Sequence, residues 1–330
     1  MLKVNFLSEF YLFRKFVGVN GALVATMTQA DKIKKYAKVV FNYYGKDYDL
    51  VHSHGCFPIT FHLMKKAIKL KKPIVISAHQ THYDTDNAFL FSKQISALFK
   101  LYITRYYKFG DIVICPTQHS RNIVRRELRV DKPIKIISNG VDTERFKASL
   151  EKRKQFRKEY NLNNTTVMCV GMPIERKGFY DFIEFSREIT EHPFLWVGKR
   201  AFPLIQPDFM VNTTNLFMPG YVKDITAAYS GGDIFCFPSY YEGEGIAILE
   251  AMSCGLPVVI RDLPTYMGRF FNGENCLKAR NNKEFVEKIY YLINNPEERK
   301  RIALNGLNTA KKLDIKETAK AIYETYDELV

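Results

Sequence analysis

The 330-residue sequence lacks several features that would assign it to other classes of protein. Its six cysteines include no C-x-x-C pair, so neither a zinc ribbon nor a disulfide framework is expected. No apolar run approaches the roughly 18 to 20 residues that span a bilayer, and the first residues lack the unbroken apolar stretch of a signal peptide. No nucleic-acid-binding motif is present. We therefore expect a cytoplasmic protein with buried, reduced cysteines.

The composition is that of a globular protein, but its charge is unevenly distributed. Hydrophobic residues make up 46% of the chain and charged residues 25%, and the length suffices for two α/β domains. Residues 1–150 hold 25 Lys and Arg against 11 Asp and Glu, whereas the remainder holds 24 of each. The surplus could serve an anionic membrane surface or nucleic acid, or could be a solvated surface.

Short apolar runs alternate with amphipathic stretches along the whole chain. This alternation predicts two doubly wound parallel sheets, with strands near 4–7, 50–52, 74–77, 112–115, 134–137, 167–170, 194–197, 234–237 and 258–260. A densely charged segment at 142–164 is typical of a domain boundary.

The most informative segment follows the apolar run 233–238. Two carboxylates, Glu242 and Glu250, flank a turn that contains Gly243 and Gly245 and opens a helix. Backbone N–H groups at a helix start attract phosphate and hydroxyl oxygens, and glycines let a ligand approach the backbone. The carboxylates can accept hydrogen bonds from sugar hydroxyls. A nucleotide sugar carries all of these groups.

The same segment resembles the E-x7-E signature of retaining glycosyltransferases of family 4, and residues 237–239 and 249–259 match the flanking pattern. The resemblance implies the GT-B fold, two Rossmann-like domains facing across a cleft. The domains would span 1–150 and 151–330, with the last helix, about 315–330, packing back on the first. It also implies that Glu242 lies by the donor sugar and that Glu250 binds the nucleotide ribose. Gly243, Glu244, Gly245 and Ile246 would complete this side of the donor site.

A second segment of the same predicted domain carries cations at a helix start. Residues 170–178 end a strand and lead to Lys177 and Gly178, where the family places a lysine that holds the pyrophosphate. Fixed cations stabilise the charge that grows on a departing nucleoside diphosphate without a metal. Many members also have an arginine directly after the strand glycine, and this chain has Met172 there. We therefore expect Arg176 to supply the second cation, or the clamp to be weaker.

Two segments of the first domain are candidates for the substrate site. Gly18 lies where the family has a glycine-rich loop that contacts the donor. Residues 79–89 resemble the H-x-T-x-x-D-x-x-N-x-F segment of bacterial enzymes that glycosylate diacylglycerol lipids. The resemblance assigns His79 to the sugar, and Asp84 and Asn87 to the acceptor. Neither the histidines at 52 and 54 nor the triplet 84–86 is assigned to a metal, and no cofactor is expected.

Two basic amphipathic stretches, 61–72 and 95–108, raise the possibility of membrane contact. Lys65, Lys66 and Lys69 accompany apolar residues at helical spacing, which is what an interfacial helix needs. The alternative is that the apolar faces pack on the sheet. With the lipid-type segment at 79–89, we expect a peripheral protein at the inner face of the cell membrane.

The sequence thus predicts a retaining hexosyltransferase that uses UDP-glucose or UDP-galactose and acts on diacylglycerol or monoglycosyl-diacylglycerol. Its partners would be the UDP-hexose, the glycerolipid and the anionic membrane, with no nucleic acid. Two alternatives stay open: a family 4 transferase for cell-wall, capsular or lipopolysaccharide sugars, and a GT-B epimerase that acts on the nucleotide sugar alone.

Overall fold

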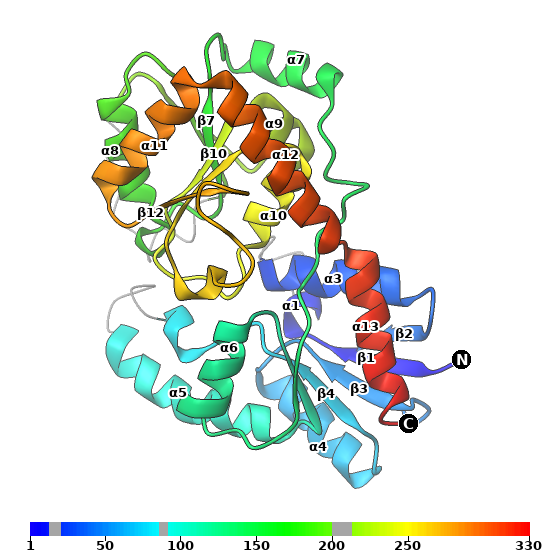
Figure 1. Ribbon diagram of the computed structural model, residues 1–330. Coiled ribbons are helices and arrows are strands. Elements are labelled where there is room, and N and C mark those ends of the chain that lie inside the picture. Colours follow the sequence, from blue (N-terminus) through cyan, green and yellow to red (C-terminus); the bar gives the residue numbers. More distant parts are fainter. Residues whose placement is uncertain (13–20, 86–91, 200–212) are drawn as a thin grey trace. The chain divides into compact units, whose positions relative to one another are not determined.

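A computed structural model describes residues 1–12, 21–85, 92–199 and 213–330 (Figure 1). The chain divides into two compact units, and each is described by itself. Unit 1 comprises Met1–Asp84, Gln94–Gly140 and Leu313–Val330, whereas unit 2 comprises Thr85–Lys93 and Val141–Lys312. The C-terminal segment therefore belongs to unit 1, together with residues more than a hundred positions earlier in the chain.

Unit 1 is built on a six-stranded parallel sheet in the order β2-β1-β3-β4-β5-β6. Its strands are β1 (Lys3–Leu7), β2 (Lys38–Phe41), β3 (Leu50–Ser53), β4 (Ile74–Ser77), β5 (Ile112–Cys115) and β6 (Ile134–Ile136). Its helices are α1 (Glu9–Leu12), α3 (Gly21–Ile33), α4 (Pro58–Lys69), α5 (Ser92–Lys108), α6 (Gln118–Asn122) and α13 (Ile315–Asp327), with a 3-10 turn η1 (His82–Thr85) and a π-helical turn η2 (Ile123–Glu127).

Helices cover both faces of this sheet because alternate strand residues point to opposite faces. Leu63 of α4, Ile103 of α5 and Ile123 of η2 join one buried cluster. Ile33 of α3 and Ile322 of α13 join the cluster on the other face. The red helix α13 in Figure 1 thus completes the core of unit 1.

Unit 2 has its own six-stranded parallel sheet, in the order β12-β11-β10-β7-β8-β9. Its strands are β7 (Val167–Val170), β8 (Phe194–Val197), β9 (Leu216–Gly220), β10 (Ile234–Phe237), β11 (Val258–Arg261) and β12 (Leu277–Ala279). Its helices are α7 (Leu150–Glu159), α8 (Phe179–Glu188), α9 (Ile225–Gly231), α10 (Ile246–Ser253), α11 (Asn282–Asn294) and α12 (Pro296–Lys312), with 3-10 turns η3 (Glu175–Lys177) and η5 (Pro264–Tyr266).

Both sheets confirm the predicted doubly wound α/β class. The strand order reverses between β1 and β3 in unit 1 and between β7 and β10 in unit 2. In open parallel sheets, ligands bind beyond the carboxyl ends of the strands at such a reversal. The loops that follow β3, β7 and β10 are therefore the first places to examine for a site.

The charged segment at 142–164 is part of unit 2 rather than a free linker. Phe146 is buried against Tyr229, with ring centroids 6.0 Å apart. Ser149 caps α7 by accepting a hydrogen bond from the Lys152 amide. The chain passes from unit 1 to unit 2 between Gly140 and Val141, earlier than the expected boundary after residue 150, because Val141 and Phe146 are already buried.

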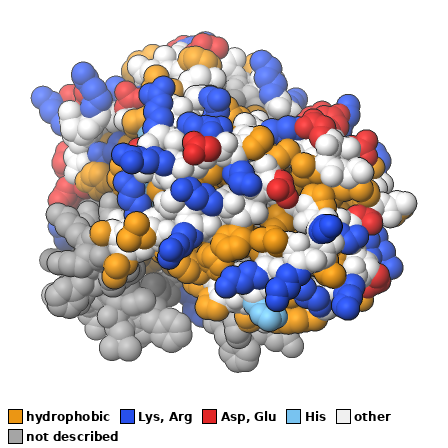
Figure 2. All heavy atoms as spheres, turned by 90° about the horizontal axis from the view of Figure 1, so that it is seen from below, with side chains coloured by type: hydrophobic (Ala, Val, Ile, Leu, Met, Phe, Trp, Pro, Cys, Tyr) orange, Lys and Arg blue, Asp and Glu red, His pale blue; other side chains and the backbone are white. Residues whose placement is uncertain are grey.

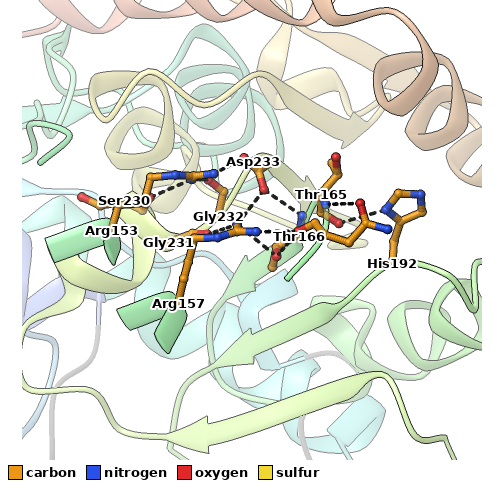
Figure 3. Close-up of polar contacts among 10 residues, drawn as sticks. Arg153, Arg157, Thr165, Thr166, His192, Ser230, Gly231, Gly232 and Asp233 are labelled. Atoms are coloured by element: carbon orange, nitrogen blue, oxygen red, sulfur yellow. Dashed lines mark hydrogen bonds and ion pairs between the residues drawn. The ribbon is translucent and has the colours of Figure 1, made fainter. Parts of the chain in front are cut away.

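The arginines of α7 fasten this helix to the sheet (Figure 3). Arg153 and Arg157 both bind the Asp233 carboxylate, at 2.7 Å and 2.9 Å. They also donate to the carbonyls of Gly232 and Gly231 at the end of α9, at 2.8 Å and 3.0 Å. Charge-assisted bonds from two planar guanidinium groups hold α7 tightly.

Candidate functional site

The two segments that the sequence singled out in unit 2 lie side by side. The loop after β10 leads to α10, the loop after β7 leads to α8, and these two strands are neighbours at the reversal of strand order. The amide of Tyr240 donates to the Arg176 carbonyl at 2.9 Å, and the Arg176 guanidinium donates to the Tyr241 carbonyl at 3.0 Å. Hydrogen bonds in both directions therefore join the two loops.

A glycine makes this close approach possible. Gly178 has φ +71°, and a Cβ at this position would lie 2.5 Å from the Pro238 carbonyl oxygen. A larger residue would meet both a steric clash and an unfavourable backbone conformation. The glycine after Lys177 thus fixes the distance between the two loops.

Lys177 and Glu242 meet at this junction. The Lys177 ammonium forms an ion pair with Oε1 of Glu242, and the carboxylate is buried. The Ser239 hydroxyl donates to the same oxygen at 2.7 Å. The lysine also lies over the Phe237 ring, 5.3 Å from its centroid. A buried carboxylate with two partners is held in one place, since an unpaired charge would be costly there.

The turn between the two glutamates is anchored by the next segment of the chain. Glu244 is buried in an ion pair with Arg269, and the Thr265 hydroxyl donates to the Gly243 carbonyl at 3.0 Å. Gly245 has φ +86° and begins α10, so Ile246 is the first residue of the helix. The helix therefore starts in the turn, as the sequence predicts.

Glu250 lies on α10 in an environment that differs from that of Glu242. Its Oε2 accepts a hydrogen bond from the Tyr229 hydroxyl at 2.7 Å. Burial raises the pKa of Glu250 to about 7, although the Tyr229 hydrogen bond and the charge of Arg145 lower it. This carboxyl group therefore changes its charge near neutral pH, whereas Glu242 has a lysine as its partner.

In unit 1, three histidine rings gather at the carboxyl ends of β3 and β4, where His52 is part of β3 and His54 follows it. His79 follows β4, and its Nε2 lies 2.9 Å from Nδ1 of His54. The His52 ring is 4.0 Å from that of His54, and its Nε2 bonds the Ser77 hydroxyl at 2.9 Å. Burial lowers the pKa of His79 to about 4, and it lowers the pKa of the other two well below the ordinary value. All three rings are neutral at pH 7.

The other predicted residues of unit 1 are only partly described. Gly18 and Asn87 lie outside the described residues. Asp84 falls in the turn η1. Lys65 and Lys69 are exposed on α4, whereas Lys66 is half-buried and donates to the Tyr44 carbonyl.

On α5 the apolar residues divide between two faces. Ile103, Tyr106 and Tyr107 are buried against the sheet, as the packing alternative requires. Leu98 and Leu101, in contrast, are about 70% and 69% exposed. The packing alternative is therefore confirmed for the buried residues, whereas membrane contact through the exposed ones stays a prediction.

Family models match both halves of the chain. One described as "Glycosyltransferase Family 4" matches residues 20–145, and one described as "Glycosyl transferases group 1" matches residues 151–309. The processive diacylglycerol alpha-glucosyltransferase of Acholeplasma laidlawii is 32% identical over 291 residues, which cover 86% of each protein. The chain belongs to glycosyltransferase family 4.

Other similar proteins differ in the acceptor that their names give. An N,N'-diacetylbacillosaminyl-diphospho-undecaprenol alpha-1,3-N-acetylgalactosaminyltransferase of Campylobacter jejuni is 26% identical over 72% of this chain and 64% of that protein. A crystal structure of Anabaena HepE in complex with UDP and glucose matches all of both chains at 18% identity, with a TM-score of 0.79. The transferase therefore has the predicted GT-B fold, and membership of the family makes it a hexosyltransferase of the retaining type.

Some residues around the site were not predicted from the sequence. Tyr229 and Arg269 each bind one of the predicted glutamates, yet they come from separate segments whose proximity only the fold reveals. His54 was considered only as a metal ligand. Among the described residues, no group of three or more His, Cys, Asp and Glu could hold a metal ion.

Proposed function

We propose that the transferase moves a hexosyl group from UDP-glucose or UDP-galactose to diacylglycerol or a monoglycosyl-diacylglycerol at an anionic membrane surface. The main support is the 32% identity, over most of both chains, to an enzyme named as a diacylglycerol glucosyltransferase. A face of unit 1 that combines exposed cations and apolar side chains gives independent support.

In this proposal unit 2 binds the donor. Glu250 accepts hydrogen bonds from the ribose hydroxyls, and Glu242 accepts them from the hexose. Lys177 and Arg176 hold the diphosphate, and the start of α10 offers N–H groups of Gly245 and Ile246. The ion pair between Lys177 and Glu242 keeps both side chains in place before the donor arrives.

The chemistry then depends on charge that grows during the reaction. As the bond from the anomeric carbon to the phosphate oxygen breaks, that oxygen gains negative charge, which Lys177 stabilises. The acceptor oxygen bonds to the anomeric carbon on the same face of the sugar, and the leaving phosphate takes the proton of that hydroxyl. No side chain forms a covalent bond to the hexose, and His79 contacts the sugar while Asp84 and Asn87 orient the acceptor.

The membrane-facing surface is made by α4 and α5, which pack together through Phe61 and Tyr102, 5.1 Å apart at their centroids. Its exposed residues are Lys65, Ile68 and Lys69 on α4 and Leu98, Leu101, Arg105 and Lys108 on α5. Figure 2, which views the structure from below, has hydrophobic side chains gathered among Lys and Arg. Each basic residue near an anionic surface contributes on the order of 1 kcal/mol. Apolar side chains among the cations can enter the headgroup boundary.

No helix among the described residues is long and apolar enough to cross a bilayer. In this proposal the α4–α5 face makes the contact with the membrane that holds the lipid acceptor. A substrate in the bilayer and an active site in the protein can meet only if the protein docks at the membrane surface.

The alternative is a lipid-linked or polymeric acceptor, and the similarity to the Campylobacter enzyme favours it. The deciding experiment supplies radiolabelled UDP-glucose or UDP-galactose with anionic vesicles. These contain diacylglycerol, monoglucosyl-diacylglycerol or an undecaprenyl-diphosphate sugar, and the lipid products are separated by thin-layer chromatography.

We expect label in the lipid fraction with one of the first two acceptors. Label with only the undecaprenyl acceptor would reject the glycerolipid assignment in favour of the alternative. Conversion of one UDP-hexose into another without any acceptor would instead identify an epimerase. A Lys177→Ala variant serves as the control for background hydrolysis.

A further inference from the structure

The hydrogen bond between His54 and His79 constrains where their protons lie. Because both rings are neutral, one nitrogen of the pair donates and the other accepts. Nε2 of His79 is occupied by this contact. Its Nδ1 has no hydrogen-bond partner among the described residues, and the ring is only half-buried. Nδ1 is therefore the atom of His79 that can reach a substrate.

Burial decides which ring donates. His54 is 4% exposed, and its Nε2 is buried without a hydrogen-bond partner in the described part of the chain. If His79 donated to Nδ1 of His54, the remaining proton of His54 would be on Nε2, as a buried N–H with no acceptor. Buried N–H groups are rarely left unpaired, and each costs about 1–3 kcal/mol. If Nδ1 of His54 donates to His79 instead, Nε2 of His54 carries no proton, and no buried N–H is left without an acceptor.

Packing fixes the orientation of the His54 ring. Phe6 of β1 stacks on it, with centroids 4.8 Å apart, and His52 lies 4.0 Å away. The His52 ring is itself held by bonds from its two nitrogens to the hydroxyls of Tyr326 and Ser77. His54 therefore presents Nδ1 to His79 in a fixed direction, so it can govern the tautomer of its neighbour.

We propose that His54 is a positioning residue: its Nδ1–H donates to Nε2 of His79, which fixes His79 as the tautomer with its proton on Nδ1. This proton then points away from His54, and His79 acts as a hydrogen-bond donor to an oxygen of the bound sugar, not as a base. The role in transfer rests on the proposed function, in which His79 contacts the sugar. The proton positions on the His54 and His79 rings do not depend on the proposed function.

The test measures the tautomer directly, without substrate. Histidine labelled with nitrogen-15 gives different correlation patterns for protons on Nδ1 and Nε2, and the loss of one ring system in His79→Asn assigns the signals. We expect the Nδ1–H form of His79 at pH 7.5. His54→Asn retains an N–H near the position of Nδ1 and should retain this form. His54→Leu, of similar shape, should lose it or give a mixture. Thermal unfolding confirms that each variant is folded.

Activity provides the second readout. We expect His54→Leu to lower kcat about tenfold, as the loss of one aligned hydrogen bond does, while UDP affinity stays constant. His54→Asn should restore most of the rate. If no lipid acceptor is accepted, the hydrolysis rate of the UDP-hexose replaces transfer as the readout, so failure of the glycerolipid assignment does not affect this test.

Three results would overturn the proposal. The first is a wild-type His79 with its proton on Nε2. The second is a His54→Leu variant with an unchanged tautomer and an unchanged kcat. The third is full activity in His79→Asn, because His54 would then have no substrate contact to position.

Discussion

Removal of the Tyr229 hydroxyl should weaken nucleotide binding in a pH-dependent way. This hydroxyl donates to Glu250, whose pKa is about 7, and it favours the charged carboxylate. A hydrogen bond to a charged group is worth roughly 1.5–3 kcal/mol, and 1.36 kcal/mol corresponds to one pH unit. In Tyr229→Phe the pKa of Glu250 should therefore rise by roughly one to two pH units above its present value.

The consequence for binding follows from the fraction of Glu250 that is charged. In the wild type about half is ionised at pH 7, whereas the variant would have roughly a tenth to a hundredth ionised. If the ribose binds the carboxylate, the Kd for UDP at pH 7 should rise about five- to fiftyfold. The difference should shrink as the pH rises to 9, since both proteins become ionised.

Isothermal calorimetry with UDP between pH 7 and 9 measures this difference. Tyr291→Phe is the matched control, because the Tyr291 hydroxyl also binds a glutamate, Glu298 at 3.2 Å, but on the exposed surface. Equal Kd values for Tyr229→Phe and wild type at pH 7, or a difference that does not change with pH, would refute the role of Glu250 in ribose binding.

The same carboxyl group should reduce stability at high pH. The pKa of Glu250 rises from 4.5 to about 7 on folding, so the folded protein binds more protons between these values and loses stability as the pH rises through them. The loss in the free energy of unfolding amounts to at most about 3–4 kcal/mol. Glu250→Gln should consequently raise the Tm at pH 8, relative to wild type, while it weakens UDP binding. A lower Tm at pH 8 would contradict this linkage.

Two further predictions concern the cations of each unit. Lys177→Ala should lower kcat more than it raises KM, because the phosphate charge that the lysine faces grows in the transition state; a change in KM alone would limit the lysine to ground-state binding. Lys65→Glu with Lys69→Glu should lower co-sedimentation with anionic vesicles and leave the Kd for UDP unchanged. The matched reversal of Lys311 and Lys312, exposed on α12, should have little effect; equal effects of the two reversals would argue against docking through the α4–α5 face.

Much of the fold followed from local sequence patterns. Apolar runs such as 74–77 and 234–237 form central parallel strands that are buried on both faces, so their hydrophobicity identifies them without any partner. The start of α10 could likewise be predicted, because Gly245, which adopts a positive φ, directly precedes the helix. The charged segment at 142–164 was harder, because α7 is held by arginines and a carboxylate instead of a broad apolar face.

Residues of the candidate site could be proposed from the sequence only where one segment contains the whole pattern. Glu242, Glu250 and Lys177 lie in motifs that local sequence can identify. Their partners Tyr229 and Arg269, and the contact of His54 with His79, join segments that are separated by 21 or more positions. These residues come together only through the order of the strands in each sheet. A single sequence does not state that order.

The most direct test of the account is the anomeric configuration of the product lipid. The enzyme, UDP-glucose labelled with carbon-13 at the anomeric carbon, and anionic vesicles that contain diacylglycerol are incubated, and the extracted glycolipid is examined by nuclear magnetic resonance. Retention of the donor's configuration predicts an α-linked glucosyl-diacylglycerol, and UDP-galactose tested in the same way covers the second donor. A β-linked product would contradict the proposed function. So would the absence of labelled glycerolipid from both donors when vesicles with diacylglycerol and vesicles with monoglucosyl-diacylglycerol are each tested.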